Sequence, residues 1–426
     1  MPFNVIVFNQ PWFVEELREL GHRVVSVGRF NPKAFDVFLD KVVTPVEDVL
    51  LQMPSGFEPD CIVYHDDSWP IAVTGLENLQ IPKIFYSVDA HHHWRWHGHF
   101  GALFDLVLVA LKDYLVKFHP FCPQVEWFPL WAPIEMVPEK EKTIDVCFRG
   151  NLNPNLHPLR VEFFEKLQKL ITVDVKQGPY TKDFPRSKIV INEAVKDDVN
   201  FRIFEAVASS ALLITPAIAN GLNELFAPGE ELVLYEKGNV QDACDKIKYY
   251  LEHEEERQRI ADSGFRRVQA CHSVKKRTEQ LAMFMEKITL GQRPTQWFSA
   301  AYVYAYAGGM LAKTEEKVCA LKVLKAGIAS LGASLQQKEQ LLDNWQVVAI
   351  SLAVSMLGLG KIEEALELTS KLHNEFPEDE ILTIGLLNVL QKKGDMATAE
   401  AVAQEMSSKP AELLQAVPDL INKLMI

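Results

Sequence analysis

Cysteine is scarce and scattered in this chain of 426 residues. None of its six cysteines forms a Cys-x-x-Cys pair, so we expect reduced thiols in a reducing cytosol. A glycine fingerprint is also missing, because the first apolar segment, Val5–Phe8, is followed by Asn9-Gln10-Pro11-Trp12 rather than by Gly-x-Gly-x-x-Gly. A nicotinamide-dependent dehydrogenase is therefore not expected.

An excess of basic residues, a leader and a membrane-spanning run are missing as well. Lys and Arg number 44 against 57 for Asp and Glu, giving a formal charge of -13. This balance excludes a general attraction to nucleic acid or to an anionic membrane. Met1–Asn4 leads directly into a strand without a basic region. The longest uncharged stretch, Pro294–Ala312, is interrupted by polar residues and predicts a buried helix. We expect a cytoplasmic protein without a membrane span.

Short apolar segments alternate with amphipathic ones over the first two thirds of the chain. Strands are predicted at 5–8, 23–27, 37–39, 61–64, 83–88, 145–148, 173–175, 189–191 and 211–214. This alternation favours parallel sheets with helices on both faces. A stretch at 129–143 with three prolines predicts a linker between two such sheets. Two open parallel sheets that face a cleft place ligands at the carboxyl ends of their strands.

From about residue 296 onward the sequence predicts helices only. Gly360 and Ala365 recur as Gly394 and Ala399, a spacing of 34 residues that is the tetratricopeptide period. A plain array of helical hairpins with accidental spacing is the alternative. The predicted domains are 1–138 (Rossmann-like, acceptor side), 139–290 (Rossmann-like, nucleotide-sugar side) and 291–426 (tetratricopeptide-like helices).

The segment from Lys188 to Pro216 is the richest in candidate binding residues. A predicted strand ends at Asn192, and Asn200-Phe201-Arg202 opens a helix that carries Glu205. A helix N-terminus with an arginine suits an anion such as a diphosphate. A carboxylate one turn further suits a ribose diol. The alternative is an amphipathic helix whose Arg and Glu are simply solvated.

The second domain resembles the C-terminal half of a GT-B glycosyltransferase, most closely the CgeB-like branch of the group-1 glycosyltransferases. The resemblance spans residues 145 to 284 and is carried by several short motifs in a fixed order. They are Val146-Cys147-Phe148-Arg149-Gly150-Asn151, Ser187–Asn192, Val199–Ala206, Ala211–Thr215, Asn223–Phe226, and Gly264–Val268 with His272 and Arg277.

The resemblance implies which residues bind a nucleotide-diphosphate sugar, with UDP, GDP or TDP as the nucleotide. Glu205 would bind the donor ribose as the second acid of a Glu-x7-Glu motif whose first acid is Asp197. The residues implied at the donor are Arg149, Asn151, Gly178, Tyr180, Lys188, Asn200, Arg202 and Glu205. No metal ion is implied, because side-chain cations and a helix dipole take its place.

The first domain is expected to supply the catalytic residues. Asp89 and His91 directly follow a predicted strand, so that either is a candidate for taking the acceptor's proton. Two alternatives stay open: a metal site in the histidine cluster 91–99, and a polar loop without chemistry. His65-Asp66-Asp67 is a second candidate patch after the preceding strand.

These expectations combine into a glycosyltransferase that moves a sugar from a nucleotide-diphosphate donor to an acceptor hydroxyl. A protein or peptide acceptor docking on the helical repeats is a further hypothesis. The aromatic stripe Trp297, Tyr302, Tyr304 and Tyr306 is predicted to be core packing rather than a peptide groove. Two alternatives are a nucleotide-sugar epimerase and a non-catalytic scaffold that uses the repeats.

Overall fold

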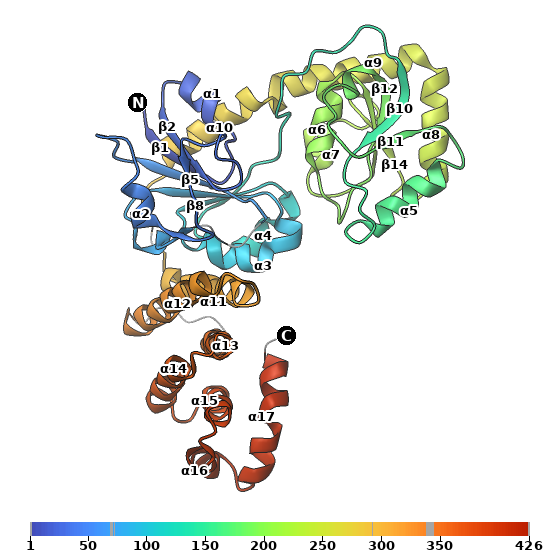
Figure 1. Cartoon of the computed structure of the whole chain (residues 1–426). Helices are drawn as coiled ribbons and strands as arrows, with labels where there is room; N and C mark the ends of the chain where they lie inside the picture. Colours follow the sequence, from blue (N-terminus) through green and yellow to red (C-terminus); the bar gives the residue numbers. More distant parts are fainter. Residues whose placement is uncertain (1, 69–70, 72, 292, 338–344, 425–426) are drawn as a thin grey trace.

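The computed structural model describes residues 2–68, 71, 73–291, 293–337 and 345–424 (Figure 1). Two α/β domains come first in the chain and an all-helical region follows them. This is the fold class predicted from the sequence. All six cysteines are free thiols, and four of them are buried.

The first domain is built on a seven-stranded parallel sheet in the order β3-β2-β1-β5-β7-β8-β9. Its central strands are fully buried, as expected for a parallel sheet covered on both faces. The strands are β1 (Asn4–Phe8), β2 (Arg23–Gly28), β3 (Val37–Phe38), β5 (Cys61–His65), β7 (Lys83–Ser87), β8 (Leu106–Val109) and β9 (Val125–Trp127). The helices include α1 (Val14–Glu19), α2 (Val46–Leu50), α3 (Ala90–Gly101) and α4 (Leu115–Phe118).

The second domain has a five-stranded parallel sheet in the order β11-β10-β12-β13-β14. Its strands are β10 (Ile144–Arg149), β11 (Asp174–Lys176), β12 (Ser187–Ile191), β13 (Leu212–Pro216) and β14 (Val233–Tyr235). Its helices are α5 (Pro158–Leu167), α6 (Phe201–Ala208), α7 (Leu222–Leu225), α8 (Val240–Glu252) and α9 (Glu254–Arg267). The predicted linker at 129–143 contains no helix or strand and joins the two sheets.

The chain returns to the first domain before the helical region begins. After a π-helical turn at Val268–His272, α10 (Val274–Lys287) runs back and lies beside α1 (Figure 1). The amide of Ala132 donates a hydrogen bond to the carbonyl of His272 over 2.8 Å, so the two crossing segments meet. The last part of the predicted domain 139–290 therefore lies on the first domain.

The helical region consists of consecutive helical hairpins. Its helices are α11 (Gln296–Leu311), α12 (Lys317–Gln337), α13 (Trp345–Gly358), α14 (Ile362–Glu375), α15 (Glu380–Lys393), α16 (Met396–Met406) and α17 (Pro410–Leu424). The 34-residue echo has a structural counterpart. Gly360 and Gly394 have φ angles of 72° and 83° just before α14 and α16. Ala365 and Ala399 are fully buried at equivalent places. The tetratricopeptide assignment itself stays a prediction.

The helical region is attached to the first domain through α11. The Tyr304 hydroxyl donates a hydrogen bond to Glu77 over 2.6 Å and accepts one from the amide of Gly75 over 2.8 Å. Pro294–Ala312 is thus mostly a buried helix, as predicted. In the described part of the chain, α12 alone has the length and composition of a membrane-spanning helix. Its most apolar window has a mean hydropathy of 1.5 and is 39% buried.

Candidate active site between the two α/β domains

A pocket of about 240 Å³ lies between the two α/β domains at the carboxyl ends of their strands. The first domain lines it with residues that follow β1, β5 and β7 and with one linker residue. The second domain contributes the segment that enters α6. The lining residues are Gln10, Trp12, Asp66, Asp67, Ser68, Val88, Asp89, Leu130, Asp198, Asn200 and Phe201. The rings of Trp12 and Phe201 meet across the domain boundary at 5.8 Å. This is the place at which open parallel sheets bind ligands.

Asp89 lies in this pocket, and His91 lies beside it. Asp89 is the N-cap residue of α3, and its carboxylate accepts a hydrogen bond from the Ser68 hydroxyl. His91 is buried, and its Nδ1 has no partner among the described residues. Burial, and then the neighbouring His92, lower the pKa of His91 to about 4, so its ring is neutral at pH 7. Within the described residues no hydrogen bond joins Asp89 to His91.

The second domain places a carboxylate opposite Asp89. Asp198 lines the pocket, and burial, followed by the negative charge of Asp89, raises the pKa of Asp198 to about 7. Asp197, the expected first acid, lies elsewhere: it is part of a left-handed turn with φ 59° and pairs with Lys237 at 2.5 Å. Asp197 therefore does not line the pocket, whereas the residue that follows it does, and the role expected for Asp197 at the donor stays a prediction.

Arg202 is partly buried beneath the turn that follows β10. Its Nε donates to the carbonyl of Arg149 over 2.7 Å, and its Nη1 donates to Asn192 Oδ1 over 2.8 Å. A Cβ on Gly150 would lie 2.1 Å from Nη2, so a side chain at that position would displace the guanidinium. Burial lowers the pKa of Arg202 to about 10, which leaves it charged at pH 7. A partly buried cation thus lies behind the start of α6.

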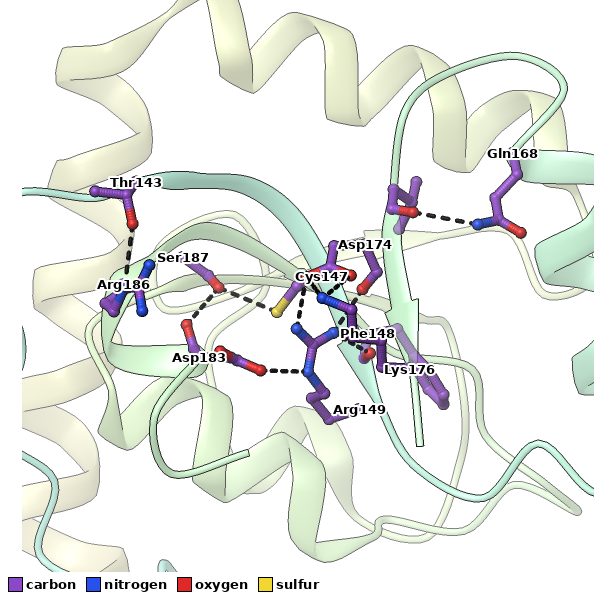
Figure 2. Close-up of polar contacts among 11 residues, drawn as sticks. Thr143, Cys147, Phe148, Arg149, Gln168, Asp174, Lys176, Asp183, Arg186 and Ser187 are labelled. Carbon is purple, nitrogen blue, oxygen red and sulfur yellow. Dashed lines mark hydrogen bonds and ion pairs between the residues drawn. The ribbon is translucent and has the colours of Figure 1, made fainter. Parts of the chain in front are cut away.

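Arg149 does not face the pocket with a free guanidinium, contrary to the expectation that it binds a diphosphate. Figure 2 shows it clamped between two carboxylates. Its Nε donates to Asp183 and its Nη2 to Asp174, each over 2.6 Å, while Nη1 donates to the carbonyls of Phe148 and Asp174. The side chain is 2% exposed. These contacts tie together β10, β11 and the segment before β12.

Lys188 also departs from its expected place. It is the second residue of β12, and its Nζ donates to Asp145 near the start of β10 over 2.6 Å. Parallel strands share one direction, so both residues lie at the amino ends of the strands. The pocket is at the carboxyl ends. Lys188 therefore lies away from the pocket, and its expected contact with a phosphate stays a prediction.

The other expected donor residues surround α6 and the loops beside it. Asn200 is the N-cap residue of α6, and its buried Oδ1 has no partner among the described residues. Glu205 lies near Tyr180, and burial raises the pKa of Glu205 to about 7. Asn151 accepts the amide hydrogen of Asn153 over 2.9 Å in a local turn. Gly178 is exposed with φ 139°. Their roles at a donor remain predictions.

The histidine cluster is spread around α3 rather than gathered. His97 is fully buried and bonded to Ser87, and His99 stacks on Tyr302 at 3.8 Å. Over the residues that the structure describes, no three His, Cys, Asp or Glu side chains are arranged to hold a metal ion. Metal-independent chemistry stays a prediction.

Two acidic residues, Asp66 and Asp198, line the pocket although the sequence analysis did not give them a main role. Asp66 belonged to the second candidate patch, and its two oxygens accept backbone hydrogen bonds inside the pocket wall. Asp198 is placed there only by the left-handed turn at Lys196 and Asp197. A non-glycine residue with positive φ is uncommon and is not evident from residue type, so the place of Asp198 had no clear signal in the sequence.

Comparisons with known proteins bear on the fold. Residues 158–283 match the model of a family described as glycosyl transferase-like. No curated protein matches the chain. Anabaena HepE in complex with UDP aligns with a TM-score of 0.50 and 12% identity over 68% of this chain and 100% of that one. A glycosyltransferase from Rickettsia africae ESF-5 aligns with a TM-score of 0.48 and 11% identity over 67% of this chain and 98% of that one. The two α/β domains have the fold of GT-B glycosyltransferases, and the segment that matches the family contains α6 with Arg202 and Glu205.

Proposed function

We propose that the chain is a glycosyltransferase that moves a sugar from a nucleotide-diphosphate donor to an acceptor hydroxyl in the pocket between its α/β domains. The observation that carries this proposal is the pairing of two features. One is a pocket at the carboxyl ends of two parallel sheets, and the other is a glycosyl transferase-like family match over the helix that enters it. HepE, which shares the fold, was solved with UDP and with UDP-glucose.

The donor diphosphate lies at the N-terminus of α6 in this proposal. The partly buried Arg202 guanidinium is there, and both the helix dipole and the arginine favour an anion. Glu205 lies one turn further along α6 and, with Tyr180 from the loop after β11, holds the ribose hydroxyls. Arg149 and Lys188 are left out, because both already pair with carboxylates.

Asp89 acts as the general base on the acceptor side. Its carboxylate takes the proton of the acceptor hydroxyl, and that oxygen bonds to the anomeric carbon of the donor sugar. The bond between this carbon and the diphosphate breaks, and the nucleoside diphosphate leaves with the electron pair. A general base of this kind contributes about 10²–10⁴-fold in rate. Asp198, which faces the pocket from the second domain, orients the sugar hydroxyls.

The helical region is proposed to hold a macromolecular acceptor, such as a protein, close to this pocket. Its first helix packs against α3, the helix that begins at Asp89. An acceptor bound to the helices would therefore be close to the base. The reaction is proposed to take place in the cytoplasm, where nucleotide sugars are available.

A thermal-shift panel with UDP, GDP, TDP, CDP and their sugars tests the proposal. A ligand at 100 times its dissociation constant stabilises the folded state by roughly 2.7 kcal/mol. We expect one nucleotide series to raise the melting temperature clearly, and no response to any nucleotide would contradict the proposal. Incubation with the donor alone separates transfer from epimerisation, because an epimerase converts the donor sugar without an acceptor.

A further inference from the structure

The backbone of the loop that carries Asp89 is hydrogen-bonded to another acidic side chain, Asp66. One oxygen of Asp66, Oδ2, accepts the amide hydrogens of Val88 over 3.2 Å and of Asp89 over 2.8 Å. The other, Oδ1, accepts the amide hydrogen of Ser68 over 2.7 Å. The Ser68 hydroxyl in turn donates to the carboxylate of Asp89. Asp66 thus fixes the backbone of Asp89 directly and its side chain through Ser68.

Asp66 is supported by a fully buried histidine from α3. His97 Nε2 lies 3.5 Å from Asp66 Oδ1, and His97 Nδ1 lies 2.8 Å from the Ser87 hydroxyl. Burial lowers the pKa of His97 well below its usual value, so the ring is neutral. The tautomer with its proton on Nε2 suits this arrangement, since Nδ1 then accepts the Ser87 hydrogen, while Nε2 lies beside Asp66 without a hydrogen bond to it among the described residues.

His97 itself cannot shift easily, because both sides of α3 are packed. Phe85 of β7 contacts the His97 ring edge to face at 5.3 Å. The neighbouring Trp96 stacks on Tyr306 at 6.0 Å, which ties the same turn of α3 to α11 of the helical region. The imidazole is therefore a rigid support for Asp66.

We propose that Asp66 and His97 are positioning residues that hold Asp89 at the reacting hydroxyl, an inference that rests on the proposed role of Asp89 as the base. Asp66 is not the base itself, because its oxygens already accept three backbone hydrogen bonds from within the pocket wall. Preorganisation of a base by buried hydrogen bonds is worth a large factor in rate, since a small misplacement of a reacting group is costly.

Amide hydrogen exchange tests the positioning without any need for an acceptor. In Asp66→Asn the Asp89 amide faces a weaker, neutral acceptor, and we expect it to exchange at least about 10-fold faster than in the native protein. His97→Leu removes the side chain that packs beside Asp66, and it should also make the Asp89 amide exchange faster. His97→Gln keeps an N–H near the Nε2 position and should restore protection. Native exchange at Asp89 in both Asp66→Asn and His97→Leu would overturn the proposal.

A matched control lies at the other end of the same strand. Asp60 precedes β5 as Asp66 follows it, and its carboxylate also accepts a backbone hydrogen bond, from Asn4 over 2.8 Å. Asp60→Asn should leave exchange at Asp89 unchanged. A rise in exchange at Asp89 in Asp60→Asn would mean that any loss of charge on this strand loosens the loop, and it would remove the specific role of Asp66.

Turnover separates this inference from the function on which it rests. With the nucleotide sugar that gives the largest thermal shift as donor, Asp66→Asn and His97→Leu should lower kcat by about 10–100-fold and leave nucleotide affinity unchanged. His97→Gln should recover most of kcat. Full turnover in Asp89→Asn would overturn the base and the positioning role together. Loss of turnover in Asp89→Asn with native rates in Asp66→Asn and His97→Leu would overturn the positioning role alone.

Discussion

Asp89 and Asp198 line one pocket from opposite domains, and the negative charge of Asp89 contributes to raising the pKa of Asp198 to about 7. Carboxylates that share a cleft influence each other's protonation. In the proposed reaction Asp89 is the base, and Asp198 donates or accepts hydrogen bonds. In this proposal the reacting atoms lie between the two domains.

Replacing Asp89 should separate catalysis from binding. Asp89→Asn keeps the shape of the N-cap side chain but cannot take a proton, so kcat should fall by about 10²–10⁴-fold while the Kd for the nucleotide stays constant. His91→Ala should have a smaller effect, because His91 does not line the pocket. Initial rates and titration calorimetry measure the two quantities. Full activity in Asp89→Asn would move the search for the base to Asp198.

Stability should depend on pH through Asp198. The folded chain holds the Asp198 proton up to about pH 7, whereas the unfolded chain releases it near pH 4. The free energy of unfolding therefore falls as pH rises between these values. Asp198→Asn removes this pH dependence. Its free energy of unfolding, compared with that of the native protein, should therefore rise by roughly 1–2 kcal/mol on going from about pH 4.5 to pH 8, a figure reduced for partial solvent access.

Urea denaturation at both pH values measures this effect. Asp197→Asn is the matched control, because Asp197 forms a surface ion pair with Lys237 outside the pocket. Its loss should cost no more than about 1 kcal/mol at either pH. Equal pH dependence in Asp198→Asn and the native protein would contradict the burial of this carboxyl.

Arg149 should matter for stability rather than for the donor. Arg149→Met removes the shared partner of Asp174 and Asp183, and we expect the free energy of unfolding to fall by about 2–3 kcal/mol. This is less than for a fully buried pair, because the two carboxylates are 29% and 27% exposed. Nucleotide affinity, measured at a temperature where the variant is folded, should stay native. A loss of affinity without a loss of stability would return Arg149 to the donor site.

The helical region should be energetically coupled to the first domain through Tyr304. Tyr304→Phe leaves the buried Glu77 carboxyl without its closest donor, and we expect a loss of about 1–3 kcal/mol in the free energy of unfolding. Tyr306→Phe on the same helix is the control, since Tyr306 is 40% exposed. Denaturation monitored by tryptophan fluorescence measures both. An unchanged stability in Tyr304→Phe would mean that the two parts fold independently.

The sequence predicted most of the two parallel sheets, because buried parallel strands are continuous apolar runs. β1, β2, β5, β7, β10 and β12 all lie where they were expected. Leu106–Val109 forms β8 and is equally apolar, but it was not among the predicted strands. The helical echo at 34 residues also corresponds to equivalent helices. Strands and helical repeats of this kind depend on residues close together in the sequence, and the periodicity of apolar residues predicts such local structure.

The site was predicted less completely, because side-chain direction depends on the ends of strands and on turns. Lys188 directly precedes the predicted strand 189–191 and is the second residue of β12, so it lies at the amino edge of the sheet, away from the pocket. The left-handed turn at Lys196 and Asp197 places Asp198 in the pocket wall, while Asp197 pairs with Lys237 outside it. Arg149 lies at the carboxyl end of β10, as expected, but its guanidinium pairs with Asp174 and Asp183, and both partners are distant in sequence. None of these three outcomes is encoded by residue type alone.

Glu205 gives the most direct test of a nucleotide-sugar site, by calorimetry with UDP and 2′-deoxy-UDP. Glu205→Ala removes charge-assisted hydrogen bonds worth roughly 1.5–3 kcal/mol, so UDP affinity should fall by about 10- to 150-fold. The deoxy analogue should bind the native protein more weakly but lose little further in Glu205→Ala, because both changes remove the same contact. Strictly additive losses, or no binding of UDP or of any other nucleoside diphosphate to the folded native protein, would contradict the account.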